Sequence, residues 1–304
     1  MAEADGPRKA DGICLLSGAH RVRLKWHRMR RRLDDIPFTP AILAEALAAG
    51  ASSEVDLRAH GEAGFVVQHD ETLDRETTGS GPVATATEAQ LRRLHRRGAD
   101  GHPTSERLLL LNDLADLAGR EAAPGALVQL DLKEDAAAIS PTLARNFGRA
   151  IAPVAARFIL SGHDWEAVGR LAQATKESGA KELALGFDPC GDKAMERLES
   201  YRDFEVFVAE ALRRAPAAST IYLDYGIILK AAATGHDIVR AFHAAGKLID
   251  AYTLNLSHPQ AERSLRRLVD LKVDQITTDE PIALQACFEQ GQRAAERILA
   301  TRAE

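Results

Sequence analysis

The sequence predicts an α/β protein built as a (β/α)8 barrel. Short runs rich in β-branched and aromatic residues alternate with longer stretches rich in alanine, leucine and arginine, a pattern typical of βαβ units and a parallel sheet. Nine candidate strands suffice for eight barrel strands and one additional strand. The length of 304 residues suits such a barrel, which typically uses roughly 250 residues. A doubly wound open sheet is the alternative architecture.

The candidate elements follow one another along most of the chain. We expect strands at Val22–His27, Ser53–Leu57, Phe65–His69, Leu127–Lys133, Phe158–Ser161, Leu183–Phe187, Thr220–Asp224, Leu248–Thr253 and Gln275–Thr278. We expect helices at Thr39–Ala49, Asn112–Leu117, Ile139–Ile151, Trp165–Glu177, Lys193–Tyr201, Phe207–Leu212, Gly235–Ala245 and Gln260–Leu271. The connection between Ser53–Leu57 and Phe65–His69 is too short for a crossover helix, so these two strands should pair antiparallel.

One region interrupts the alternation of strands and helices. From Asp70 to about Leu111 the chain is polar, contains the run TTGSGP and lacks a strong strand signal. We interpret it as an insertion over about residues 70–111 that lies on the barrel rim. The expected organisation is therefore an N-terminal extension of residues 1–20 and one barrel domain of residues 21–304.

Composition and charge argue against several classes of protein. A hydrophobic content of 45% and a charged content of 27% fit a folded domain, and the net charge of −5 gives no reason to expect a nucleic-acid partner. No apolar run approaches the roughly 18 residues of a transmembrane helix, and the apolar patch Ile13–Leu16 is too short for a signal peptide. The three cysteines are far apart. We expect a cytoplasmic protein with a small-molecule substrate, and a homo-oligomer is compatible with the sequence.

Two predicted strands carry carboxylates at alternate positions. Glu54 and Asp56 lie two residues apart, so their side chains point to the same face of the strand. Asp131 and Lys133 repeat this geometry at another strand end. Three oxygen ligands without a nearby cysteine favour Mg²⁺ or Ca²⁺ over Zn²⁺. The alternatives are an exposed acidic strand face for the first pair and a simple ion pair for the second.

Two histidines each close a predicted strand. His27 ends the run VRLKWH and His69 ends the run GFVVQH, so both should point to the mouth of the barrel. Histidine exchanges protons near neutral pH, and phosphoryl chemistry needs one base and one acid. Arg28 has a planar guanidinium suited to phosphate, whereas Arg30–Arg32 fits a solvated loop. The alternative for each histidine is a hydrogen-bonded structural role.

Taken together, these motifs resemble the glycerophosphodiester phosphodiesterase family. The family opens with His-Arg-Gly, continues to a Glu-x-Asp strand, and then has Val-Val-x-His-Asp followed by Leu-x-Arg-x-Thr-x-Gly-x-Gly. The corresponding segments here are His27-Arg28, Glu54-Val55-Asp56, Val66-Val67-Gln68-His69-Asp70 and Leu73-Asp74-Arg75-Glu76-Thr77-Thr78-Gly79-Ser80-Gly81. Later segments keep the family order: Leu130-Asp131-Leu132-Lys133, Ile159-Leu160-Ser161-Gly162, Tyr252-Thr253-Leu254-Asn255 and Thr277-Thr278-Asp279-Glu280-Pro281. The likeness spans roughly residues 22–281.

The resemblance implies a fold, an activity and a set of site residues. It implies a (β/α)8 barrel with a small insertion after the His-Asp strand. It also implies a divalent cation, and hydrolysis of glycerophosphodiesters or related lipid-derived phosphodiesters to glycerol 3-phosphate and an alcohol. The implied residues are the metal ligands Glu54, Asp56 and Asp131, the general base and acid His27 and His69, and the phosphate-binding Arg28 and Lys133.

Three positions depart from the family pattern. Met29 replaces the glycine after His-Arg, where its side chain is expected to crowd the site. Pro37-Phe38-Thr39-Pro40 replaces Pro-Glu-Asn-Thr, and Asp131 replaces a longer glutamate. An Asp-x-Lys at this place also looks like the related sphingomyelinase D group. These departures leave two alternatives: a catalytically impaired phosphodiester-binding barrel, and a phospholipase D-like or phosphoryl-transferring relative.

Overall fold

Eight parallel strands form a closed barrel at the centre of the computed structural model, which describes residues 11–303 except 122, 192–195, 197 and 199–202. The barrel strands are β2 (His20–Trp26), β3 (Ser52–His60), β7 (Leu127–Leu132), β8 (Phe158–Gly162), β9 (Ala184–Phe187), β10 (Thr220–Asp224), β11 (Leu248–Tyr252) and β12 (Gln275–Thr278). Each strand pairs with the next, and β2 pairs with both β12 and β3, which closes the ring. The predicted (β/α)8 barrel is confirmed, and the open sheet is excluded.

Two further strands join the barrel sheet in antiparallel pairs. Strand β4 (Gly64–Val67) runs back along β3, with Val67 opposite Leu57, as the short connection between them predicts. Strand β1 (Cys14–Ser17) pairs with β2 and buries Leu15. The segment that the sequence assigned to an N-terminal extension therefore contributes a strand to this sheet.

Helices surround the barrel and follow most of its strands. They are α1 (Pro40–Ala49), α3 (Leu111–Glu121), α4 (Pro141–Ile151), α5 (Trp165–Glu177), α7 (Phe204–Arg214), α8 (Tyr225–Ala233), α9 (Ile238–Ala244), α10 (Ala261–Asp270) and α11 (Pro281–Ala303). Helix α5 has the predicted bounds because the Asp164 side chain caps its first turn, accepting from the backbone N–H groups of Glu166 and Ala167. Ser140 caps α4 in the same way, with Pro141 at the first helical position.

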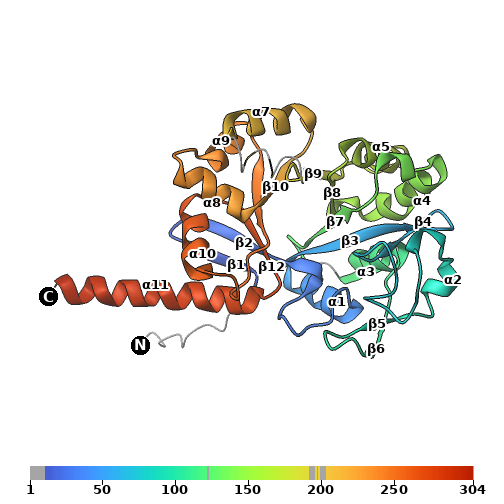
Figure 1. The fold of residues 1–304 in the computed structure, drawn as a ribbon, viewed down its shortest axis with the longest axis horizontal. Helices are drawn as coiled ribbons and strands as arrows, with labels where there is room; N and C mark the ends of the chain where they lie inside the picture. Colours follow the sequence, from blue (N-terminus) through green and yellow to red (C-terminus); the bar gives the residue numbers. More distant parts are fainter. Residues whose placement is uncertain (1–10, 122, 192–195, 197, 199–202, 304) are drawn as a thin grey trace.

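Two large hydrophobic clusters pack the helices onto the strands. One contains residues from β3, β7 and β8 together with α1 and α3–α5, and the other contains residues from β10–β12 together with α7–α10. Figure 1 shows these two groups of helices on opposite sides of the strands. Buried leucine and valine on α10, with arginines on its outer face, illustrate the amphipathic pattern that orients each helix.

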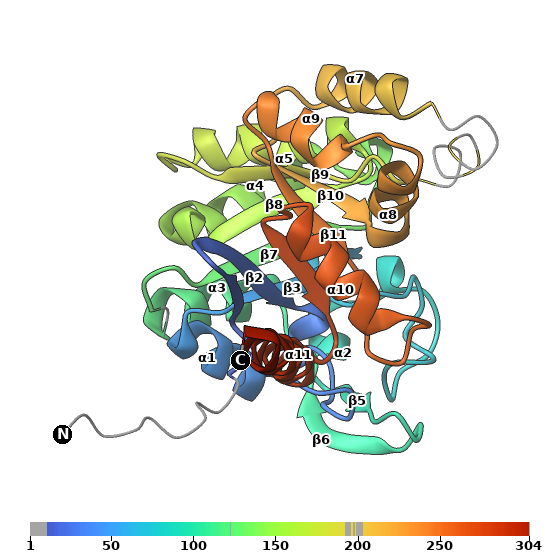
Figure 2. The same ribbon diagram turned by 90° about the vertical axis from the view of Figure 1, so that its left-hand side faces the viewer.

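Several elements differ from the sequence expectation. Helix α8 was not predicted, because Asp224 both ends β10 and caps α8, so no loop separates the strand from the helix. Helix α11 was also missed; it projects away from the barrel in Figures 1 and 2. The predicted helix Lys193–Tyr201 lies, apart from two of its positions, outside the described residues. Among the described helices, α11 included, none is long and apolar enough to span a bilayer.

The polar insertion packs onto β4 as a small unit of its own. It contains α2 (Glu88–Leu91) and the antiparallel pair β5 (His95–Arg97) and β6 (Pro103–Arg107), two short strands that the sequence did not reveal. Figures 1 and 2 show this pair at the edge of the molecule far from α7. A third hydrophobic cluster holds the insertion in place, built from Val66, Leu73, Val83, Ala86, Leu91, Leu108 and Leu110.

Candidate active site

A hollow of about 540 Å³ opens at the carboxyl ends of the barrel strands. In a barrel of parallel strands this end brings together residues from many separate segments of the chain. All seven residues singled out in the sequence line this hollow: His27, Arg28, Glu54, Asp56, His69, Asp131 and Lys133. The structure therefore brings together side chains that lie up to 106 positions apart in the chain.

Three carboxylates form the acidic part of the hollow. Glu54 and Asp56 point inward from β3, and Asp131 on the neighbouring strand β7 is in register with Asp56. One oxygen from each carboxylate lies within 4.8 Å of the other two. Burial, together with the negative charge of Asp56, raises the pKa of Glu54 to about 7. Such a cluster is electrostatically unfavourable unless positive charge is close to it.

Two basic side chains of the protein supply part of that positive charge. Lys133 Nζ lies 2.8 Å from Asp56 Oδ1 and donates a hydrogen bond to Asp131. Although burial opposes it, the charges of Asp131 and Asp56 raise the pKa of Lys133. Arg28 Nε lies 3.4 Å from Asp56 Oδ2, and the backbone N–H of Arg28 donates to Glu54 Oε2 at 2.9 Å. Both cations therefore lie beside the carboxylates, where an anionic ligand would also meet them.

The carboxylate oxygens fit a hard divalent cation. Asp56 Oδ2 is buried and has no hydrogen-bond partner among the described residues, so an acceptor is left for another ligand. The three donors are oxygen atoms from two adjacent strands, a set that suits Mg²⁺ or Ca²⁺. A second acidic group, His69 with Asp70 and Glu76, is already occupied by ion pairs with Arg75. The first cluster is therefore the better candidate for a metal.

His27 is held by Asp279, to which the sequence analysis assigned no individual role. Asp279, which follows β12, accepts from His27 Nδ1 at 2.9 Å. Asn255 in turn donates to Asp279 Oδ2 at 2.7 Å and accepts the backbone N–H of Asp279. Although burial opposes it, the hydrogen bond and charge of His27 hold the pKa of Asp279 well below its usual range. His27 Nε2 is thereby placed 3.9 Å from Glu54 Oε2, on the edge of the acidic cluster.

His69, which follows β4, has a similar partner. Its Nδ1 lies 2.9 Å from Asp70 Oδ1, and Asp70 is also paired with Arg75. The hydrogen bond from Arg75 lowers the pKa of Asp70 to about 2. The backbone N–H of His69 donates to Glu76 at 3.4 Å. Both histidines thus have a carboxylate at Nδ1, which leaves Nε2 available for proton transfer.

The two substituted positions near His27 point away from the hollow. Met29 has a φ of 61° and Phe38 also has a φ of 61°, and both side chains are fully buried in the hydrophobic core. Neither lines the hollow, so the expected crowding by Met29 does not occur. The buried guanidinium of Arg96 lies 4.9 Å from the ring centre of Phe38 and donates to Gln68 at 2.8 Å. Phe38 and Arg96 therefore fill space behind the strand end that carries His69.

The hollow is also lined by three side chains to which the sequence analysis assigned no role. Tyr252 ends β11, His163 follows β8 and Asp188 follows β9, and all three line the hollow. The Tyr252 hydroxyl donates to Asp188 Oδ2 at 2.8 Å, and His163 Nδ1 lies 3.7 Å from the same oxygen. Their position in the sequence could have revealed them, because polar residues directly after predicted barrel strands face the mouth.

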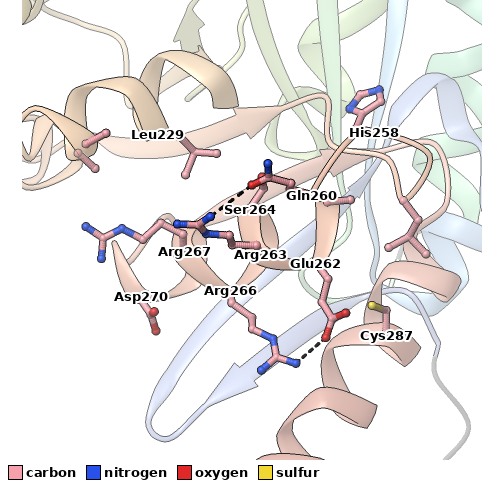
Figure 3. Close-up of a pocket in the computed structure, with 14 residues that line it drawn as sticks. Leu229, His258, Gln260, Glu262, Arg263, Ser264, Arg266, Arg267, Asp270 and Cys287 are labelled. Atoms are coloured by element: carbon pink, nitrogen blue, oxygen red, sulfur yellow. Dashed lines mark hydrogen bonds and ion pairs between the residues drawn. The ribbon is translucent and has the colours of Figure 1, made fainter.

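A larger hollow of about 1160 Å³ lies outside the barrel, beside α8 and α10. Figure 3 shows arginines of α10 along it, with Arg266 paired to Glu262 and Arg263 hydrogen-bonded to Gln260. None of the seven predicted site residues lines it. Cavity size alone therefore does not locate the converging carboxylates and histidines of this protein.

Comparison with known proteins links this arrangement to one family. The family model described as the glycerophosphoryl diester phosphodiesterase family matches residues 38–283. No curated protein matches the sequence.

Solved structures show the same fold at low sequence identity. A glycerophosphoryl diester phosphodiesterase from Parabacteroides distasonis is 18% identical, with a TM-score of 0.62 and coverage of 92% of this chain and 88% of that chain. The Thermotoga maritima glycerophosphodiester phosphodiesterase is 21% identical, with a TM-score of 0.60 and coverage of 87% and 97%. An Oleispira antarctica phosphodiesterase, solved in complex with the product sn-glycerol-3-phosphate, is 19% identical, with a TM-score of 0.58 and coverage of 88% and 96%.

Proposed function

Since the chain belongs to the glycerophosphoryl diester phosphodiesterase family, whose members are phosphoric diester hydrolases, we propose that it hydrolyses glycerophosphodiesters or related lipid-derived phosphodiesters to glycerol 3-phosphate and an alcohol. The observation that carries this proposal is the convergence of three carboxylates and two histidine–carboxylate pairs on one hollow. The Oleispira antarctica phosphodiesterase was solved in complex with its product sn-glycerol-3-phosphate, which supports the choice of substrate class.

We propose that Glu54, Asp56 and Asp131 hold a divalent cation, Mg²⁺ or Ca²⁺. When bound, this ion would supply positive charge for the phosphodiester oxygens. Arg28 and Lys133 lie beside the same carboxylates, so their side chains can bind the phosphate and offset charge that builds up during the reaction. Met29 packs into the hydrophobic core and does not obstruct the hollow. This favours an active enzyme over a catalytically impaired barrel.

The two histidines would divide the proton transfers. In the proposed reaction His27 Nε2 removes a proton from water as the new P–O bond forms. His69 gives a proton to the alcohol oxygen as the old P–O bond breaks. If a substrate hydroxyl next to the phosphate attacks in place of water, the first product is a cyclic phosphate, and a second attack by water, with the histidines in exchanged roles, opens it to glycerol 3-phosphate. Asp279 supports the role of His27 as base, because a buried carboxylate at Nδ1 stabilises the imidazolium that forms. Solvent then restores both protonation states.

Turnover of glycerophosphocholine tests the proposal. The protein should release glycerol 3-phosphate and choline with Mg²⁺ or Ca²⁺ and should lose this activity with EDTA. His69→Ala should lower kcat by about 100-fold or more, since general acid catalysis typically contributes that much. His102→Ala is the matched control, because His102 is an exposed histidine of the insertion.

Four results would contradict the proposed metal-dependent hydrolysis or its mechanism. Metal-independent turnover, or full activity of His69→Ala, would exclude the mechanism. Binding of the phosphodiester without turnover would indicate a binding barrel. Transfer of the phosphoryl group to an added alcohol in place of water would indicate a phosphoryl-transferring relative.

A further inference from the structure

The hollow contains a further carboxylate outside the acidic cluster. Asp188 follows β9, and its side chain is 14% exposed. The backbone N–H of Cys190 donates to Asp188 Oδ1 at 2.7 Å, and the Tyr252 hydroxyl donates to Asp188 Oδ2 at 2.8 Å. Each carboxylate oxygen can accept two hydrogen bonds, so Asp188 keeps acceptor capacity toward the hollow.

Asp188 differs from Asp56 and Asp131 in the lack of a lysine or arginine partner among the described residues. Among the described residues that line the hollow, the remaining carboxylates are those of the candidate metal cluster, beside Lys133 and Arg28. Within the described part of the chain, no lysine or arginine forms an ion pair with Asp188, and the nearest basic group is the half-exposed His163 at 3.7 Å. Burial raises the pKa of the Asp188 carboxyl, the charge of His163 opposes this rise, and the negative charge of Asp131 adds to it. A positively charged ligand group would stabilise the charged carboxylate.

The groups around Asp188 determine which cation is complementary. Burial and the charge of Asp188 raise the pKa of Tyr252, so its hydroxyl stays protonated and donates to Asp188. The Tyr252 oxygen then keeps its own lone pairs, and it lies beside the free acceptor sites of Asp188. A ligand here therefore meets acceptors and a negative charge. A primary ammonium matches both, because it has three N–H donors and a positive charge. A trimethylammonium has no donor, and a neutral hydroxyl has no charge.

We propose that Asp188 and Tyr252 form a head-group subsite that selects phosphodiesters whose alcohol carries a primary ammonium, such as a 2-aminoethyl ester. The inference rests on the proposed function, because it assumes that the phosphate lies between the candidate metal cluster and Asp188. It assigns Asp188 to substrate specificity and leaves the proton transfers to His27 and His69.

The test compares three glycerophosphodiesters on the metal-loaded protein. Their alcohols are 2-aminoethanol, choline and glycerol, so only the head group changes. Wild-type protein should show the highest kcat/KM for the aminoethyl ester. Asp188→Asn should lower that value by about 10- to 100-fold, as expected for loss of a charged hydrogen bond, and should change the value for the glycerol ester by less than about threefold.

Two further variants separate specificity from folding. Asparagine at position 188 can still accept the N–H of Cys190, so Asp188→Asn should keep the thermal midpoint close to wild type. Tyr252→Phe should lower kcat/KM for the aminoethyl ester by a smaller factor, about 3- to 10-fold. Asp164→Asn removes a carboxylate that follows β8, caps α5 and does not line the hollow, so it should leave the substrate preference unchanged.

The outcomes distinguish this inference from the proposed function. Equal kcat/KM for the aminoethyl and glycerol esters, a preference for the choline ester, or an equal loss for all esters in Asp188→Asn would overturn the subsite while leaving phosphodiester hydrolysis intact. If no ester is hydrolysed, the proposed function fails, and calorimetry with O-phosphoethanolamine and methyl phosphate decides the subsite. Tighter binding of O-phosphoethanolamine that is lost in Asp188→Asn would support it, and equal binding would refute it.

Discussion

Replacement of Asp279 by asparagine should disable His27 without removing it. The Asp279 side chain is 11% exposed and accepts from His27 Nδ1 at 2.9 Å, from Asn255 at 2.7 Å and from Arg30 at 3.2 Å. In Asp279→Asn one carboxylate oxygen is replaced by an NH₂ donor, so only some of these three hydrogen bonds can be kept. The remaining groups then meet a donor where they need an acceptor.

The cost can be estimated from these contacts. Hydrogen bonds to charged groups stabilise a protein by about 1.5–3 kcal/mol each, so the loss of one should lower the free energy of unfolding by about 2 kcal/mol. Neutral His27 carries its proton on Nδ1 when a carboxylate accepts there, which leaves Nε2 as the base. With asparagine the proton should move to Nε2, and kcat should fall about 100-fold, equal to about 2.7 kcal/mol in the barrier.

Three measurements check this reasoning on Asp279→Asn. Steady-state kinetics should show the loss in kcat with KM changed by less than about threefold, and ¹⁵N NMR of His27 should show the change of tautomer. Because the folded-state pKa of Asp279 lies below its unfolded value, the carboxylate stabilises the fold at neutral pH. The stability difference from wild type should therefore shrink as the pH falls below about 4. Asp270→Asn, an exposed position, is the control. A kcat within threefold of wild type, with the tautomer unchanged, would refute the reasoning.

Four other substitutions test the metal cluster and the packing. Asp56→Asn should weaken Mg²⁺ or Ca²⁺ binding by at least about tenfold in calorimetry, because it removes a buried anionic donor, and equal affinity would exclude Asp56 as a ligand. Gly148→Ala should destabilise the protein by about 1–3 kcal/mol in urea unfolding, since the new Cβ would lie 2.4 Å from a backbone oxygen of α5. Gly169→Ala, which meets open space on α5, should be neutral or stabilising, and equal effects at the two glycines would contradict this packing. Arg96→Met should lower the free energy of unfolding by about 3 kcal/mol, because buried partners of the guanidinium lose their donor. An unchanged urea midpoint would show that these contacts contribute little.

The parts of the site that local patterns specify were predictable. Glu54 and Asp56 are two residues apart on a strand, so their shared face follows from the period of two, and Asp131 follows from the same rule on another strand. His27 was found because it directly follows a barrel strand, whose carboxyl end faces the mouth. His69 was found because it closes a predicted strand, but it reaches the mouth because β4 runs back along β3 and brings Val67 opposite Leu57. These inferences need only the chain direction and the strand period.

Partner choice across the barrel was not predictable in the same way. Asp279 holds His27 although 252 positions separate them, and Asn255 orients Asp279 from a third strand end. The sequence showed each of these residues within a motif but gave no distance between them. Asp188 and Tyr252 likewise follow different strands, and only closure of the ring brings their side chains together.

The sequence by itself determined the barrel, its antiparallel β4 and the residues of the acidic cluster, because strand period, helix alternation and strand-end position are local properties of the chain. Only the tertiary structure decided that Met29 and Phe38 turn into the core and that each histidine has a carboxylate at Nδ1. It also decided that Asp188, outside the acidic cluster, lies beside His163 and Tyr252 in the same hollow. These features depend on backbone torsion angles and on strand order around the ring, which bring residues far apart in sequence to within hydrogen-bond distance.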